Sequence, residues 1–145
     1  MYKRQGETLK PLGQIVSGGE LSRIMLALKA ILADRDEIET LIFDEIDTGI
    51  SGRTAQKVSE KMAVIGQHHQ VLCITHLPQI AAMADSHYFI RKQTDQKNTQ
   101  TMIYKLNKEE SLKEISRMIS GDQRSEASME HAKEMKTLAD QTKLY

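Results

Sequence analysis

Two short apolar segments, separated by a helical pattern, constrain the fold of this chain more than any other feature. Residues 40–43 read Thr-Leu-Ile-Phe and lead into the acidic pair Asp44 and Glu45, and residues 71–75 form a second such run. A short continuous apolar run is typical of a strand buried on both faces of a parallel sheet. Between the runs, apolar residues spaced by three and four predict a helix: Ala55, Val58, Met62 and Ile65. Strand, helix and strand in this order predict a right-handed βαβ unit, and therefore an α/β fold.

Helical and extended patterns lie on both sides of this unit. Residues 1–16 predict a loop, and a first helix follows to about residue 33 with apolar residues at helical spacing: Leu21, Ile24, Met25, Leu28, Ile31 and Leu32. After the βαβ unit the patterns predict a short helix at 79–84, extended segments at 86–93 and 99–106 that form a β-hairpin, and C-terminal helices at about 112–121 and 125–141.

Composition excludes several classes of function. The chain carries 20 basic and 20 acidic residues among its 145, so its net charge gives no general attraction to nucleic acid. Contact with DNA would need a local patch, and a solvated surface is the simpler interpretation of the lysines near the predicted hairpin: Lys92, Lys97, Lys105 and Lys108. The single cysteine excludes a disulfide within the chain, and no apolar run approaches the ~20 residues that span a bilayer. We therefore expect a cytoplasmic protein without a membrane partner.

A first polar site lies at the start of the first predicted helix, at Ser17, Gly18, Gly19 and Glu20. The backbone N–H groups at a helix start are unpaired and carry partial positive charge, and glycines let an anion approach them. The Ser17 hydroxyl adds a donor, so the segment suits phosphate binding. An ordinary helix cap at Ser17 explains the same residues. The segment alone leaves both interpretations open.

Two further sites follow the predicted strands, where open α/β sheets bind ligands. Asp44 and Glu45 end the first strand, and adjacent carboxylates at a buried strand end are costly unless a cation or another partner compensates them. In nucleotide hydrolases such a pair holds Mg²⁺ and polarises water, although a solvated acidic turn reads the same. His76 follows Thr75 at the end of the second strand and can donate to a phosphoryl group, but a lone histidine is more often an ordinary polar residue. No His and Cys cluster has the spacing of a zinc site.

Taken in order, the three sites resemble the second half of an ATPase head of the ABC class. Residues 17–20 match the signature motif in its SMC-type form, with glutamate where transporters usually carry glutamine. Residues 42–45 resemble the Walker B strand, and Ile46 and Asp47 continue it as in SMC-type heads. His76 resembles the switch histidine. Longer strings are similar to the RecN family in particular, at 17–27, 44–52 and 75–81.

This resemblance implies the fold of a P-loop NTPase head, with residues 1–145 as the C-terminal lobe of an SMC-type head. The implied function is recombinational repair of DNA double-strand breaks, in which ATP binding and hydrolysis control how heads engage on DNA. ATP lies between two heads in that family. The implied cofactors are therefore ATP and Mg²⁺, the implied partners are DNA and a second head in an ATP-dependent homodimer, and the implied location is the nucleoid.

The resemblance also implies roles for individual residues. Glu45 would act on the attacking water, Asp44 would position Mg²⁺, and His76 would contact the γ-phosphate. The signature and the D-loop would bind the nucleotide of the opposing head through Ser17, Gly18, Gly19, Glu20 and Ser51. Ser51 stands where the D-loop of such heads commonly has aspartate, which leaves the contacts of this loop open.

The sequence contains no G-x-x-x-x-G-K-[ST] loop, which would cradle the β- and γ-phosphates. In SMC-type proteins that loop lies in the first half of the head, before a long coiled coil, so we expect this chain to begin after the coiled coil. We expect the chain alone to lack ATPase activity, and a half head to expose the apolar faces that the other half covers.

Two alternatives remain for the function. One is an ABC transporter-type ATPase subunit, which Glu20, Ile46 and Asp47 argue against. The other is a non-catalytic head fragment. The presence of both carboxylates and of His76 argues against that alternative for the whole protein, although for this chain alone it comes close to the practical outcome.

Overall fold

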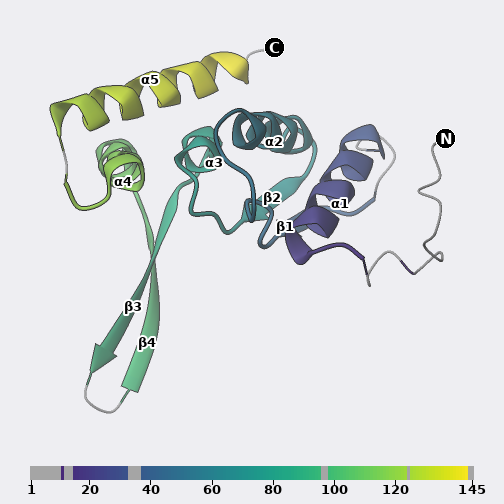
Figure 1. Ribbon diagram of the computed structural model, residues 1–145, viewed down its shortest axis with the longest axis horizontal. Helices are drawn as coiled ribbons and strands as arrows, with labels where there is room; N and C mark the ends of the chain where they lie inside the picture. The colour runs from purple at the N-terminus through teal and green to yellow at the C-terminus, as the bar shows by residue number, and fades with distance from the viewer. Residues whose placement is uncertain (1–10, 12–14, 33–36, 96–97, 124, 144–145) are drawn as a thin grey trace.

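The computed structural model describes residues 11, 15–32, 37–95, 98–123 and 125–143 (Figure 1). Its elements are, in order, α1 (Gly18–Leu32), β1 (Thr40–Phe43), α2 (Gly52–Ile65), β2 (Gln70–Cys73), α3 (Pro78–Met83), β3 (Tyr88–Asp95), β4 (Asn98–Lys105), α4 (Lys108–Ser120) and α5 (Glu126–Thr142). The predicted α/β class is confirmed. The loop predicted at 1–16 lies almost wholly outside the described residues.

The two apolar segments form a parallel pair of strands joined by α2, so the predicted βαβ unit is confirmed. Leu41 of β1 lies opposite Val71 of β2, and Phe43 lies opposite Cys73. The pairing continues just beyond β2, where the backbone N–H of Ile74 donates to the Phe43 carbonyl at 3.2 Å. Because the strands are parallel, the segments that follow them lie at the same edge of the sheet.

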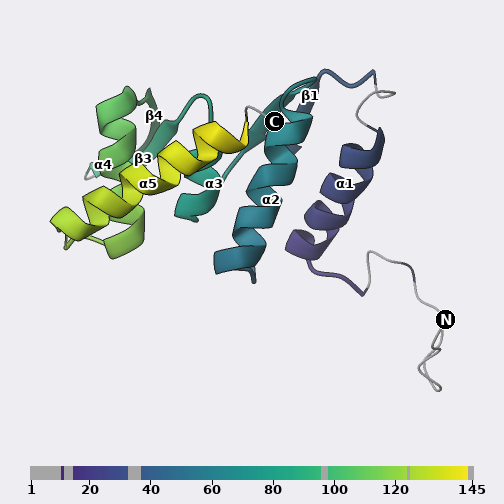
Figure 2. The same ribbon diagram turned by 90° about the horizontal axis from the view of Figure 1, so that it is seen from above.

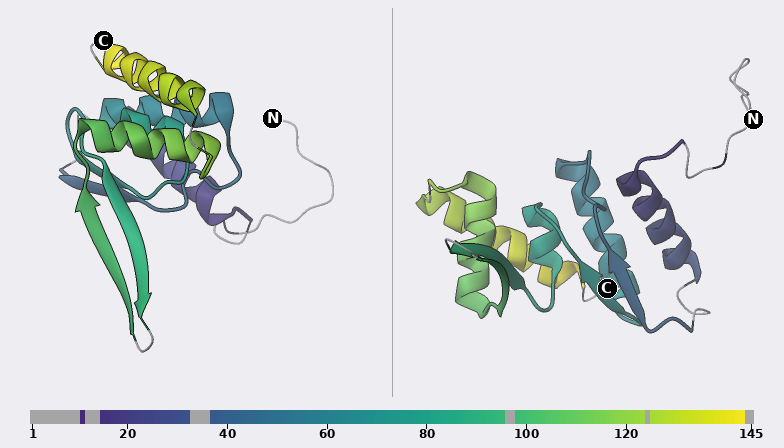
Figure 3. Two further views of the ribbon diagram at one scale, coloured as in Figure 1. Left: turned by 90° about the vertical axis from the view of Figure 1, so that its left-hand side faces the viewer. Right: turned by 90° about the horizontal axis from the view of Figure 1, so that it is seen from below.

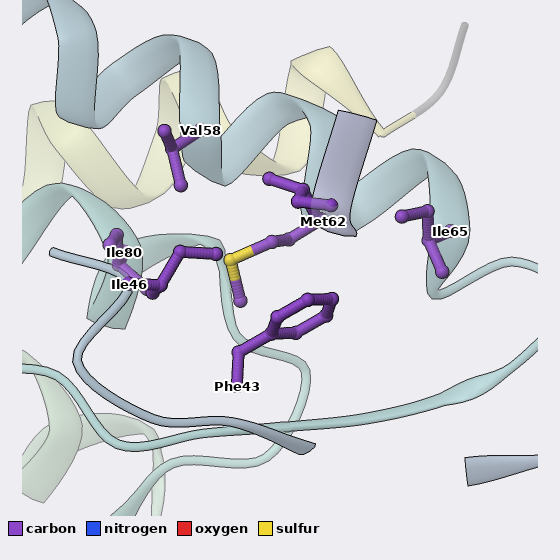
Figure 4. Close-up of a cluster of buried hydrophobic side chains, with 7 residues drawn as sticks. Phe43, Ile46, Val58, Met62, Ile65 and Ile80 are labelled. Atoms are coloured by element: carbon purple, nitrogen blue, oxygen red, sulfur yellow. The ribbon is translucent and has the colours of Figure 1, made fainter. Parts of the chain in front are cut away.

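A hydrophobic core lies between this sheet and the helices α1, α2 and α3. It consists of Leu26, Phe43, Ile46, Val58, Met62, Ile65 and Ile80. In Figure 4 the Met62 side chain extends from α2 toward Phe43 and Ile46. Ile46 and Ile65 are fully buried, and burying such a side chain contributes about 1.5–3 kcal/mol. Ile46 therefore anchors the loop that carries the acidic pair.

The prediction that both strands are buried on both faces is wrong for the described chain. Phe43 faces the helices, whereas the side chain of its neighbour Ile42 is 70% exposed. Leu72 of β2 and Ile74 just beyond it are 47% and 56% exposed. Successive side chains of a strand point to opposite faces, and the described helices lie on one side of this sheet (Figures 1 and 3). The apolar pattern therefore exceeds what the described helices cover.

The predicted first helix is confirmed as α1, but its apolar stripe does not face the described core. α1 packs on the rest of the chain through Leu26, which is 3% exposed. The stripe residues are 36% to 79% exposed: Leu21, Ile24, Met25, Leu28, Ile31 and Leu32. Hydrogen bonds from Ser22 and Arg23 to the loop after β1 set this rotation of the helix.

The predicted hairpin is also confirmed. β3 and β4 pair antiparallel over 8 residues each and project away from the helices (Figure 1). Lys92 and Lys105 are exposed on it, and Lys105 Nζ lies 6.0 Å from the centre of the Tyr88 ring. Lys108 is the exposed first residue of α4, and Lys97 lies outside the described residues.

The two predicted C-terminal helices are confirmed, and with α3 they build a second core. This core consists mainly of small residues: Ala81, Ala82, Ile115 and Ala132. α5 lies across α3 and α4 (Figure 2), and the buried hydroxyls of Ser116 and Ser128 meet at 2.8 Å between α4 and α5. Among the helices described, none combines the length and the apolar character that crossing a membrane requires.

Candidate functional site

The first predicted site, the start of α1, is closed by a capping box. The Ser17 hydroxyl accepts from the backbone N–H of Glu20 at 3.3 Å, and the Ser17 hydroxyl and N–H both donate to Glu20 Oε2 at 2.9 Å. The backbone bond from Ser17, followed by the hydroxyl bond, lowers the pKa of Glu20. The helix-cap interpretation is therefore confirmed. Phosphate binding at this helix start stays a prediction, and it would require the Ser17 hydroxyl to leave Glu20.

The two glycines of this segment lie against Glu45. A Cβ atom at Gly18 would lie 2.8 Å from Glu45 Oε2, and one at Gly19 would lie 2.7 Å from the Glu45 carbonyl oxygen and 3.1 Å from Cβ of Thr48. Real Cβ atoms do not approach a backbone oxygen so closely, so only glycine fits at position 19 without a shift of the chain. The fold thus brings the helix start and the acidic pair together, although Glu20 and Glu45 lie 25 positions apart in the sequence.

The acidic pair itself is exposed to solvent. Asp44 Oδ1 accepts from the backbone N–H of Glu45 at 2.9 Å. Glu45 has φ of 56°, in the left-handed region that non-glycine residues rarely adopt. Both carboxylates are exposed to solvent in the described structure, so there is no cost of burial that a cation would have to compensate.

An Mg²⁺ site at Asp44 is compatible with this geometry. The described residues contain no group of three or more His, Cys, Asp or Glu that could hold a metal ion by themselves. Mg²⁺ in nucleotide sites usually takes one or two carboxylates and completes its shell with phosphate oxygens and water. The exposed Asp44 carboxylate suits that role, which stays a prediction.

Two side chains tie the start of α1 to the loop after β1, and neither was singled out in the sequence. The Ser22 hydroxyl donates to the Asp44 carbonyl at 3.0 Å. Arg23 Nη1 donates to the carbonyls of Ile46 at 3.0 Å and Thr48 at 2.9 Å. A cation in the first turns of a helix is ordinarily a solvated surface residue, so no local pattern marks Arg23 for this role.

The third predicted site, Thr75 and His76, is attached to Asp47. Asp47 Oδ2 accepts from Thr75 Oγ1 at 2.6 Å and from the His76 backbone N–H at 2.8 Å, and it lies 2.9 Å from His76 Nδ1. Asp47 is 3% exposed, whereas the His76 side chain is 72% exposed. Burial acts to raise the pKa of Asp47, but the hydrogen bonds from Thr75 and His76 outweigh it, so the pKa is lowered. The sequence marked Asp47 only as part of a motif and gave no sign of this contact.

Ser51, predicted to contact nucleotide, stands apart from these contacts. It occupies the N-cap position of α2, its side chain makes no capping bond, and its carbonyl accepts from the Thr54 N–H at 3.2 Å. None of the hydrogen bonds found within the described ranges joins the Ser51 side chain to the other predicted site residues. Its role stays a prediction.

An open cleft of about 930 Å³ lies beside His76. The C-terminal part of α2, β2, α3, the start of β3 and part of α4 line it. Within the described strands β2 pairs with β1 only, so its other edge presents unpaired backbone groups to this cleft. At the wall of the cleft, His87 Nδ1 contacts Ser111 Oγ at 2.8 Å, and burial lowers the pKa of His87.

The chain is similar over most of its length to known DNA repair proteins. The chain is 49% identical over 138 residues to the DNA repair protein RecN of Bacillus subtilis, a match that covers 95% of this chain and 24% of that protein. It is 50% identical over 138 residues to RecN of Halalkalibacterium halodurans, and 48% identical over 130 residues to RecN of Treponema pallidum. The chain thus spans about a quarter of the length of the curated relatives it matches. No protein-family model matches it.

Proposed function

We propose, from the premise that this chain belongs to the RecN family, that it is the C-terminal lobe of an SMC-type ATPase head that acts in DNA double-strand-break repair. In this proposal the complete polypeptide binds ATP with Mg²⁺, pairs its head with that of a second copy, and acts on DNA in the cytoplasm at the nucleoid. The observation that carries it is the convergence of α1, the acidic pair and the His76 segment on the loop after β1.

Each site residue then has a task that its geometry supports. Asp44 would hold Mg²⁺, which when bound neutralises phosphate charge, and Glu45 would orient and polarise the attacking water. Both carboxylates are exposed at the carboxyl end of β1, where a ligand can reach them. His76 presents an exposed ring at the end of the parallel neighbour β2.

The helix start would serve the nucleotide of the opposing head. Its capping box makes that task conditional, because Glu20 already uses the Ser17 hydroxyl and N–H. A phosphate that approaches Gly18 and Gly19 would meet the Glu20 carboxylate, which is bonded to Ser17. We therefore propose that engagement of the second head displaces the Glu20 side chain and frees the Ser17 hydroxyl as a donor.

The rest of the head would cover the apolar surfaces that this chain leaves open. Three features support that proposal: the exposed sheet face at Ile42 and Leu72, the exposed stripe of α1, and the unpaired edge of β2 beside the cleft. A chain with such uncovered apolar faces fits a fold that further polypeptide completes. That polypeptide would also contribute the phosphate-binding loop. The transporter alternative loses support, because the relatives named above are all RecN proteins.

Substitution of Glu45 in a full-length RecN polypeptide that carries this segment tests the proposal. Glu45→Gln keeps the size of the side chain and removes the base, so we expect ATP turnover to fall by about 10²–10⁴-fold. ATP binding should persist, and size-exclusion chromatography with ATP should show a trapped dimer. Glu130→Gln, an exposed change on α5, is the matched control and should leave turnover unchanged.

The same assay on the 145-residue chain alone should show no turnover, because it carries no P-loop. Unchanged turnover in the full-length Glu45→Gln variant would remove Glu45 as the catalytic base. Turnover by the chain alone that disappears in its Glu45→Gln variant would contradict the need for a second lobe.

A further inference from the structure

We propose that Asp47 is the positioning residue of His76: it holds the ring through Nδ1 and thereby makes Nε2 the nitrogen that the site presents. The contact of the Asp47 carboxylate with both the backbone and the ring of His76 carries this inference. Its catalytic consequence rests on the proposed function, whereas the orientation of the ring does not.

One carboxylate oxygen makes all the contacts. Asp47 Oδ2 lies 2.9 Å from His76 Nδ1, 2.8 Å from the His76 backbone N and 2.6 Å from Thr75 Oγ1. The Thr75 hydroxyl in turn accepts from the Leu77 N–H at 3.0 Å. Backbone and ring of His76 are therefore fixed by the same acceptor, and the segment between β2 and α3 has little freedom to rotate the ring.

The protonation pattern follows from the chemistry of the acceptor. An ionised carboxylate only accepts hydrogen bonds, and the bonds from Thr75 and His76 favour the ionised form of Asp47. The proton in the contact between the ring and Asp47 must therefore sit on Nδ1. A neutral His76 then carries its lone pair on Nε2, and a protonated His76 offers an N–H there, with the Asp47 charge behind it in either case.

The carboxylate that contacts His76 does not belong to the acidic pair of Asp44 and Glu45. Glu45 and Asp44 are exposed, and among the described contacts neither carboxylate bonds to His76. The buried carboxylate of Asp47, three residues beyond Asp44, makes that contact instead, next to the fully buried Ile46. The orienting group is thus held in the core, while the oriented ring remains 72% exposed for a ligand.

The ring tautomer tests the proposal directly, by ¹⁵N NMR of the histidine-labelled 145-residue chain at a pH where the ring is neutral. A His76→Gln variant identifies the His76 signals. We expect Nδ1 to carry the proton in the unsubstituted chain, in contrast to the Nε2–H form that dominates in free histidine. A His76 ring in the Nε2–H form would overturn the proposal.

Two substitutions at position 47 separate the acceptor from the charge. Asp47→Asn keeps a carbonyl oxygen that can replace Oδ2, so we expect the Nδ1–H form to persist. Asp47→Leu has a similar volume and no acceptor, so His76 should revert to the Nε2–H form. Asp85→Asn, which removes an exposed carboxylate paired with Lys143, is the control and should change nothing at His76. Circular dichroism tests whether each variant is folded.

Either of two results would count against the proposal: a folded Asp47→Leu variant that keeps the Nδ1–H form, or an Asp47→Asn variant that loses it. If Asp47→Leu does not fold, Asp47→Asn and Thr75→Ala decide the matter. Thr75→Ala removes the bond to Asp47 from the hydroxyl and leaves both bonds from His76, so the Nδ1–H form should remain.

Kinetics of the full-length polypeptide test the catalytic consequence. Asp47→Leu should lower kcat by about 10²-fold with little change in KM for ATP, since a misplaced group loses its transition-state contact. The double variant with His76→Ala should be no slower than His76→Ala alone. Additive losses would show that Asp47 acts apart from His76. A Glu45→Gln variant with normal turnover would defeat the proposed function while leaving the NMR result intact.

Discussion

The sheet region (α1, β1, α2 and β2) and the helical region (α3, α4 and α5) differ in how far their apolar side chains are covered. The core of the sheet region contains large side chains such as Phe43 and Met62, yet the outer sheet face and the α1 stripe stay exposed. The core of the helical region is built mainly from alanines around Ile115, and Leu138 is the large apolar side chain that its described helices expose.

The helical region also satisfies its helix ends locally. Asn107 and Glu110 form a capping box on α4, and Ser125 and Ser128 form one on α5. Lys136 Nζ donates to the Ala82 and Ala84 carbonyls at the end of α3, both at 2.9 Å. The start of α1 has a capping box as well, so the two regions differ in the cover of their apolar side chains and not in their caps. The helical region covers most of its large apolar side chains at least in part, whereas the sheet region, which holds the site residues, leaves a sheet face and the α1 stripe exposed.

Two identical substitutions in the sheet region should give very different effects on stability. Ile65→Ala empties part of the core, and we expect it to lower the free energy of unfolding by about 2–5 kcal/mol. Ile42→Ala acts on the exposed face and should change it by less than about 0.5 kcal/mol. Urea denaturation of the 145-residue chain measures both. Equal losses would show that the outer sheet face is covered in solution, and the comparison of the two regions would then break.

Removal of one cap in each region should have a smaller effect and sharpen the comparison. Asn107→Ala removes the cap of a helix that packs on α5, so we expect a loss of about 1 kcal/mol in the free energy of unfolding. Ser17→Ala removes the cap of α1, which packs mainly on α2, so its loss should appear first as local opening. Amide hydrogen exchange along α1 and α4 separates the two. Faster exchange throughout the chain in Ser17→Ala would show that α1 unfolds with the rest.

The smallest predicted effect is a pH dependence at the boundary between the hairpin and the helical region. Burial lowers the pKa of His87 below its ordinary 6.5, so the unfolded chain takes up this proton first as pH falls. The contribution of neutral His87 to stability is therefore complete above about pH 6.5 and is lost as pH falls through the folded pKa. Thermal unfolding of the chain and of His87→Gln across this range measures it. A dependence of Tm on pH that persists unchanged in His87→Gln would assign the effect to another group.

The sequence predicted the elements of this fold well, because helical spacing and short apolar runs are local properties. It predicted the places of the site residues too, since Asp44 and His76 follow adjacent parallel strands. The apolar runs alone predicted strands buried on both faces, because an apolar strand reports the cover that a whole fold provides. The open sheet face agrees instead with the expectation, implied by the family resemblance, that a half head exposes apolar faces.

Individual contacts escaped prediction for another reason. Asp47 meets His76 across 29 residues, and Arg23 meets Ile46 and Thr48 across 23 and 25. Such pairs depend on how a loop packs in three dimensions, which no spacing rule records. The apolar stripe of α1 did not indicate which face of the helix packs on the core, for the same reason. The hydrogen bonds of Arg23 to the loop turn the helix so that Leu26 faces the core.

The loop after β1 has a consequence for communication between the helix start and the His76 segment. Arg23 and Ser22 bind its carbonyls from α1, while its Asp47 side chain holds the His76 segment on the other side. A ligand that prefers one arrangement of this short loop acts on the affinity of the helix start and of the His76 segment together. Thermodynamic linkage requires the same factor in the reverse direction, so a partner bound at α1 would be felt at His76 as strongly as a nucleotide at His76 would be felt at α1.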